Sequence, residues 1–307
     1  MCVTAGCSSG FLGLAPVGDR KEYVQARTSY EEGNYQAAVT QLSEYIYKTK
    51  NVKRREARAY RLLGKSYEQL GLTSRALETY SEALEFHPEN LPLLLETARL
   101  YQQNAMTARS IEMYDRALKL EPNNPEALTG QAANYTSMGF YSKARNYYDR
   151  FFSLSDEISP DYRARYAGTF LHQRRYEQAF IHITLALEQD YTNPDFWLLS
   201  AQARRGLNQP QQALKDLQAA LTLAPQRTDL WAYKMLWLYE AGKYDASLKA
   251  AQRLLTLQPG NALAQLTQAL NWQKQSKTKA AQKQLEQLAA AKPQTFVSQV
   301  AKKLLEK

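Results

Sequence analysis

The sequence predicts an all-α protein built from stacked helical repeats. The first observation is an order of small, aromatic and proline residues that recurs after 34 residues. Two successive copies are Tyr67, Ala76, Tyr80, Ala83, Pro88 and Tyr101, Ser110, Tyr114, Ala117, Pro122. The second is the same spacing far downstream, between Pro225, Pro259 and Pro293. Because a repeat array grows by stacking, a length of 307 residues does not require two globular domains.

Each repeat is expected to form two antiparallel helices, which we call A and B. A glycine supplies the turn between them, and a proline prevents the next helix from continuing back into helix B. The turn glycines are Gly33, Gly71, Gly139 and Gly242, and examples of the terminating prolines are Pro88 and Pro122.

Small residues recur in both helices of the repeat. Two helices approach closely only where side chains are small, so we expect helix contacts at these positions. In helix A they are Ala26, Gly64, Ala98, Ala132, Ala167, Ala201 and Ala269. In helix B they are Ala38, Ala76, Ser110, Ala144, Ala179, Ala213, Ser247 and Ala281. Large residues such as Tyr67, Tyr80 and Tyr114 should fill the space around them, which assigns most of the 21 tyrosines to packing.

The period and the order of residues resemble the tetratricopeptide repeat (TPR) family. The resemblance implies a right-handed α-solenoid of about eight helix pairs. The expected repeats span 19–52, 57–90, 91–124, 125–158, 160–193, 194–227, 228–261 and 262–295. The expected domains are a tether at 1–18, the solenoid at 19–295 and a capping helix at 296–307. In the capping helix, Phe296, Val300 and Leu304 are expected to face the last repeat.

The composition excludes a disordered chain, since 44% of the residues are apolar and 22% are charged. The net charge of +9 favours an anionic partner, which includes acidic proteins, nucleic acids and membranes, although a basic surface also aids solubility. The only two cysteines, Cys2 and Cys7, lie at the N-terminus, so the predicted fold needs no disulfide. No apolar run reaches the 18 residues expected of a membrane-spanning helix.

The segment Thr4 to Ser9 resembles the processing box of bacterial lipoproteins. The small residues Ala5 and Gly6 precede Cys7, and a flexible stretch follows it. The resemblance implies that Cys7 carries a lipid and anchors the chain at the periplasmic face of a membrane. Thr4 departs from the usual pattern, and the charged and apolar regions of a signal peptide are absent. We therefore expect either a start codon upstream of Met1 or, as the alternative, a cytoplasmic protein.

The sequence carries no pattern typical of catalysis. Its three histidines, His87, His172 and His182, show no metal-ligand spacing, and no phosphate-binding loop or nucleophile elbow is present. The prediction is a protein that is not an enzyme and that holds no cofactor or metal.

The resemblance to the TPR family places one face of helix A in a partner-binding groove. Carried over to this sequence, the groove residues of the first three repeats are Arg20, Tyr23, Arg27, Arg58, Arg61, Lys65, Arg99 and Gln102. Later repeats offer Leu171, Leu198, Leu236, Tyr239, Leu263, Leu266 and Leu270. This predicts a groove that is basic first and apolar later, suited to a protein segment with acidic and apolar stretches. The alternative is that the charges are merely solvated and the leucines pack internally.

These patterns together predict a non-catalytic scaffold that binds a protein segment. The lipoprotein resemblance favours an envelope-anchored bacterial protein that assists assembly of a multiprotein complex. A cytoplasmic adaptor or regulator is the second interpretation. Binding of nucleic acid or another polyanion by the basic repeats is the third interpretation. It ranks below the other two because only Tyr23 and Tyr30 could stack on bases among the groove cations.

Overall fold

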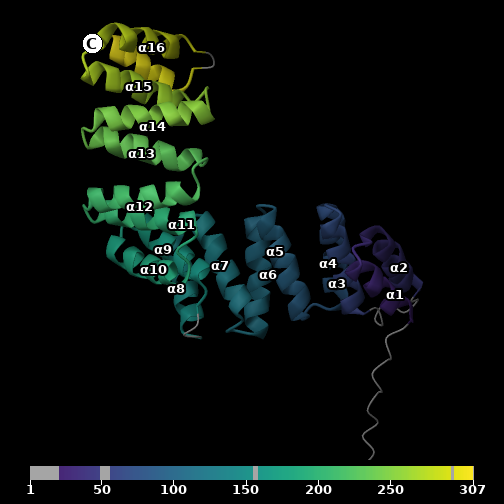
Figure 1. Ribbon diagram of the computed structural model, residues 1–307. Helices are drawn as coiled ribbons and strands as arrows, with labels where there is room; N and C mark the ends of the chain where they lie inside the picture. The colour runs from purple at the N-terminus through teal and green to yellow at the C-terminus, as the bar shows by residue number, and fades with distance from the viewer. Residues whose placement is uncertain (1–20, 49–55, 155–157, 292–293, 307) are drawn as a thin grey trace, which may run out of the picture. The chain divides into compact units, whose positions relative to one another are not determined.

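The computed structural model describes residues 21–48, 56–154, 158–291 and 294–306, and these residues form helices without any strand. The predicted all-α helical-repeat fold is confirmed (Figure 1). The helices are α1 Lys21–Glu31, α2 Tyr35–Lys48, α3 Ala57–Gln69, α4 Thr73–Phe86, α5 Leu91–Gln103, α6 Thr107–Leu120, α7 Pro125–Ser137, α8 Tyr141–Phe152, α9 Pro160–His172, α10 Tyr176–Gln189, α11 Pro194–Gly206, α12 Pro210–Leu223, α13 Thr228–Glu240, α14 Tyr244–Leu257, α15 Ala262–Lys274, α16 Thr278–Ala290 and α17 Phe296–Leu305.

The helix boundaries follow the repeat period. Helices α3, α5 and α7 begin at Ala57, Leu91 and Pro125, which are 34 residues apart. The first helix of the fifth repeat, α9, begins one residue later than this spacing gives, at Pro160, and the period then resumes. The odd-numbered helices up to α15 are therefore the A helices, and the even-numbered helices are the B helices.

The turn between helices A and B uses a left-handed residue in all eight described repeats. The four predicted turn glycines have φ between 70° and 80°. In the other four repeats the place is taken by Ala105, Arg174, Asn208 and Ser276, with φ between 56° and 61°. The turn geometry is thus kept even where the residue is not glycine, at a cost that an L side chain pays in this region.

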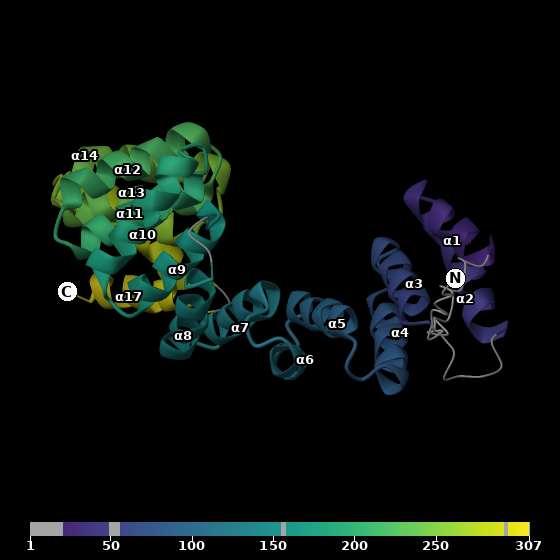
Figure 2. The same cartoon turned by 90° about the horizontal axis from the view of Figure 1, so that it is seen from below.

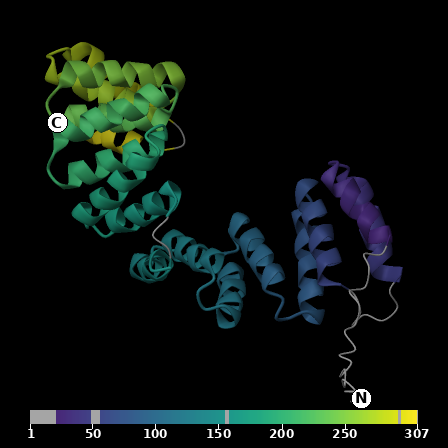
Figure 3. The ribbon, with the colours of Figure 1, turned by 60° about the horizontal axis from the view of Figure 1, so that its bottom comes forward.

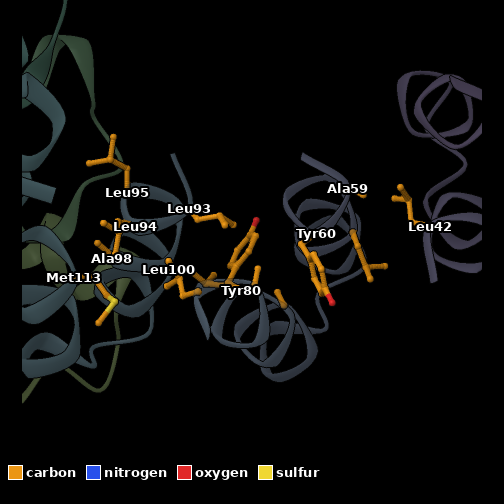
Figure 4. Close-up of a cluster of buried hydrophobic side chains, with 14 of the residues drawn as sticks. Leu42, Ala59, Tyr60, Tyr80, Leu93, Leu94, Leu95, Ala98, Leu100 and Met113 are labelled. Atoms are coloured by element: carbon orange, nitrogen blue, oxygen red, sulfur yellow. The ribbon is translucent and has the colours of Figure 1, made fainter. Parts of the chain in front are cut away.

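The predicted small positions are where the helices meet. Those of helix A and of helix B are all buried. In the second repeat, a Cβ placed on Gly64 would lie 2.2 Å from the ring of Tyr80, so the aromatic ring occupies the space that the glycine leaves. Figure 4 shows Tyr60 and Tyr80 among the buried aliphatic side chains of this core.

Serine replaces alanine at two of the small positions, and both serines are hydrogen-bonded. The hydroxyl of Ser110 donates to the backbone oxygen of Ala98 and accepts from Asn134 Nδ2 of the next repeat. Ser247 makes the same pair of bonds with Met235 and Asn271. These bonds satisfy polar groups that burial would otherwise leave costly.

The chain divides into two compact units, of which the first ends at Met138 and the second begins at Gly139. Unit 1 contains α1 to α7, and unit 2 contains α8 to α17. Within unit 1, α1 pairs with α2 and α3 with α4 (Figures 2 and 3). Within unit 2, consecutive helices from α9 to α17 pack against each other, so each unit has the layered contacts of a repeat array.

The prediction for the last helix was partly wrong. Helix α17 packs on the last repeat, but through Val297, Val300, Ala301 and Leu304. Phe296, expected inside, is 79% exposed. The four residues that pack on the last repeat have the spacing 0, 3, 4 and 7 of an amphipathic helix. The three expected residues are each four apart, and a spacing of four at every step moves gradually away from that face.

Candidate functional site

The structure describes seven of the eight predicted groove residues, and they lie in α1, α3 and α5. Arg20 and Cys7 lie outside the described residues. We call the surface formed by Tyr23, Arg27, Arg58, Arg61, Lys65, Glu68, Glu96, Arg99 and Gln102 the A-helix face of unit 1.

Arg61 and Lys65 converge on one carboxylate. Arg61 donates from Nε and Nη2 to the two oxygens of Glu96, at 2.9 and 2.6 Å. Lys65 Nζ lies 2.9 Å from Glu96 Oε1. The fork-to-carboxylate geometry is the strong form of this pairing, and the hydrogen bond to Glu96 raises the pKa of Arg61. One buried acid of α5 therefore holds two cations of α3.

Arg99 and Glu68 form a second link between the same two helices, but here the acid lies on α3 and the cation on α5. Arg99 Nη2 donates to both oxygens of Glu68, at 3.3 and 3.1 Å. Burial opposes the charge of Arg99, but its pairing with Glu68 outweighs burial and raises its pKa. Tyr80 of α4 donates to the same carboxylate at 2.6 Å, and its burial and this bond raise the pKa of Tyr80.

Weaker polar contacts extend this pattern to both neighbours. The guanidinium of Arg58 lies 4.5 Å from the ring centre of Tyr23, and its Nε donates to Glu56 Oε2 at 2.5 Å. Tyr23 is buried against Tyr45, so it serves packing as well as the face. Arg27 pairs within its own helix, with Glu31 four residues on, and both side chains are at least half exposed.

Gln102 continues the pattern from α5 to α7. Its side-chain nitrogen donates to the backbone oxygen of Gly130 at 3.0 Å and to Asn134 Oδ1 at 2.7 Å. Polar side chains thus join α3 to α5 and α5 to α7, and a cation–π contact joins α1 to α3. The side-chain contacts between α3 and α5 and between α5 and α7 join residues 28 to 35 apart, close to one repeat, so successive A helices run in the same direction and in register.

The charges on the A-helix face are arranged in depth. The carboxylates lie underneath, with side chains only 11% exposed for Glu96 and 13% exposed for Glu68. The cations lie above them, with Arg61, Lys65 and Arg99 between 32% and 38% exposed. A molecule approaching this face therefore meets cations that buried acids already hold in place.

Sequence reasoning missed Glu96. It saw a face of cations with few acids, whereas Glu96 supplies the partner of two of them. The signal was present, because Glu96 follows Arg61 by 35 residues, one repeat and one residue. A residue at that offset lies beside its counterpart when A helices stack in register.

The leucines predicted for the later groove are mostly internal. Leu198 and Leu236 pack against a buried cluster of unit 2, and Leu266 and Leu270 belong to the cluster beneath α17. Of the other two predicted leucines, Leu263 is exposed to more than a third and Leu171 is half-buried. The alternative interpretation, in which the leucines pack internally, therefore holds for Leu198, Leu236, Leu266 and Leu270. Unit 1 carries the stronger candidate site.

Within the described residues, no three His, Cys, Asp or Glu side chains are grouped closely enough to hold a metal ion. None of the described helices has both the length and the apolar character needed to cross a bilayer.

The model of the tetratricopeptide repeat family matches residues 23–90 and 198–262. The second of these segments lies in unit 2 and the first in unit 1, so both units contain matched repeats. The chain therefore contains tetratricopeptide repeats. A search of curated proteins found no significant match.

Solved structures show the same fold at low identity. A TPR protein from Parabacteroides merdae is 16% identical, with a TM-score of 0.62 over 81% of this chain and 97% of its own. PilW, described as a type IV pilus biogenesis factor, is 15% identical, with a TM-score of 0.62 over 68% of this chain and 96% of its own. YrrB, a TPR protein described as having an unusual peptide-binding site, is 16% identical, with a TM-score of 0.51 over 61% and 96%. The TPR fold is one of protein-interaction scaffolds and is typically non-catalytic.

Proposed function

We propose that this TPR protein is a non-catalytic scaffold that binds an acidic segment of a partner protein on the A-helix face of unit 1. The observation that carries the proposal is the layering of charge, with cations that are about one-third exposed above buried carboxylates. Glu96 and Glu68 fix the cations, so a bound carboxylate finds them already ordered and loses less conformational entropy. Arginine forks suit carboxylates, which favours an acidic peptide over a diffuse polyanion.

The structure also decides how the proposal is tested. Reversing Arg61 and Lys65 to glutamate would place two more acids beside the buried Glu96 and destabilise α3 and α5. A variant that spares the buried pair is Arg27→Gln with Lys65→Gln, since Arg61 still holds Glu96 by two bonds. The matched control removes two exposed cations from B helices, Arg75→Gln with Lys119→Gln.

The experiment begins with site-specific photo-crosslinking in the source organism. A photoreactive residue at exposed Arg27 or Gln103 should capture a partner, whereas one at Glu78 or Lys119 on the B helices should not. At low salt the captured protein, once identified, should bind the Arg27→Gln/Lys65→Gln variant at least about tenfold more weakly than the control. This difference should shrink at high salt, because salt screens the charges. Equal capture from both sets of helices, or equal binding by both variants, would contradict the proposal.

We further propose that Cys7 is lipidated and holds the protein at the bacterial envelope. The support is the small-residue box before Cys7 and the fold shared with a pilus biogenesis factor. Assistance in assembling an envelope complex follows from that location. In the source organism, Cys7→Ser should move the protein from the membrane fraction to the soluble fraction, as measured by fractionation and immunoblotting. If wild-type protein carries no lipid on Cys7 by mass spectrometry, this part of the proposal fails.

A further inference from the structure

Lysines are concentrated at the C-terminal end of unit 2. Residues 274–307 contain eight lysines, two glutamates and no arginine, so this stretch contributes +6 to the net charge of +9. Six of the eight lie among the described residues: Lys274, Lys277, Lys279, Lys283, Lys302 and Lys303. We call these six side chains the C-terminal lysine cluster.

The fold brings these lysines to one end of the last helices. Lys274 ends α15, and Lys277 directly precedes α16. Helix α17 follows α16 after a short connection and packs against it, so the two run antiparallel and the last turn of α17 lies where α16 begins (Figure 1). Lys302 and Lys303 therefore lie at the same end as Lys274 and Lys277. Lys279 and Lys283 are four residues apart and share one face of α16.

The C-terminal lysine cluster differs from the A-helix face in its pairing. No salt bridge joins any of the six lysines to a carboxylate of the described residues. Five of the six are exposed, and Lys302 is half-buried. The segment's own acids, Glu286 and Glu306, are exposed as well, and Glu286 accepts a hydrogen bond from Gln282. Like charges gathered without acids repel each other, and an external anionic surface would relieve that repulsion.

We propose that the C-terminal lysine cluster binds the surface of an anionic phospholipid bilayer. Lysine acts as a compact point charge and suits the diffuse charge of headgroups, whereas recognition of discrete carboxylates or bases favours arginine forks. Residues 274–307 contain no arginine, and their one aromatic ring, Phe296, begins α17, at the end opposite Lys302 and Lys303. Leu305, in the last turn of α17, is more than a third exposed and offers an apolar contact at the headgroup boundary. The proposal rests on neither Cys7 nor the A-helix face.

The test is co-sedimentation of the full, unlipidated chain with vesicles of phosphatidylcholine alone or of phosphatidylcholine mixed with phosphatidylglycerol. Binding is expected only to the mixed vesicles and should fall as salt screens the charges. The variant Lys277→Gln/Lys279→Gln/Lys283→Gln/Lys303→Gln should lower the partition coefficient at least about tenfold. The matched control, Arg75→Gln/Lys119→Gln/Arg165→Gln/Lys215→Gln, removes four exposed cations elsewhere and should bind nearly as wild type.

Circular dichroism of both variants establishes that they fold alike. The proposal is overturned if wild type ignores anionic vesicles, or if the control loses as much binding as the lysine variant. It is also overturned if single-stranded RNA binds more tightly than the vesicles with the same lysine dependence, because the cluster would then be a nucleic-acid site. Failure here leaves the acidic-segment proposal untouched, since the two use different residues and different readouts.

Discussion

At the scale of single residues, the turn between helices A and B shows geometry prevailing over residue preference. Four repeats use glycine there, and four keep nearly the same positive φ with a residue that has a side chain. Left-handed backbone costs an L residue about 1–2 kcal/mol, while glycine adds about 0.5–1 kcal/mol of entropy cost. Because the first cost exceeds the second, replacing one of the four non-glycine turn residues by glycine should stabilise the fold.

Arg174 is the sharpest test of that strain, because it has φ of 57° and an exposed side chain. Arg174→Gly should raise the free energy of unfolding by about 0.5–1 kcal/mol in a urea titration. The reverse change at an equivalent turn, Gly242→Ala, should lower it by a similar amount. If Arg174→Gly destabilises the protein, the side chain makes a stabilising contact that outweighs the turn.

At the scale of helices, the polar links between A helices act in structure as well as in binding. Glu96 binds two cations of the preceding A helix, and Glu68 binds one cation of the following A helix. Such partly buried pairs align helices in register, because a slip would leave a carboxylate without its cation. The cations of these pairs keep about a third of their surface exposed, so the same contacts order the face and leave its cations accessible. This is why charge reversal at Arg61 cannot separate binding from folding.

At the scale of the whole molecule, a repeat array transmits a local change only through neighbouring repeats. Ala76 is fully buried in the second repeat, and Ala76→Leu should cost about 1–3 kcal/mol by overpacking. Hydrogen exchange should therefore show lost protection in α3 to α6, with α11 to α16 unchanged.

The control is Ser74→Leu, an exposed position two residues earlier on the same helix, which should change protection little. Equal loss of protection in both units would contradict nearest-neighbour stability and indicate one cooperative fold. Unchanged protection everywhere would mean that Ala76 is not at a close helix contact.

The sequence by itself determined the helix pairs, because their signals are local and repeat. Gly71 marks a turn, Pro88 stops a helix, and Ala76 and Gly64 mark the close contact, all within one 34-residue unit. The inner face of α17 was misread because one short segment offered two helical spacings, and only packing chose between them.

Only the tertiary structure decided what the charges do. Arg61 and Glu96 are 35 residues apart, and their meeting depends on two A helices stacking in register. The burial of Glu96 and Glu68 beneath the cations depends on the same stacking, as does the packing of Leu198 and Leu236 into the core. Periodicity places a residue on a helix, but the neighbouring helix determines whether that residue faces solvent, a counter-charge or the core.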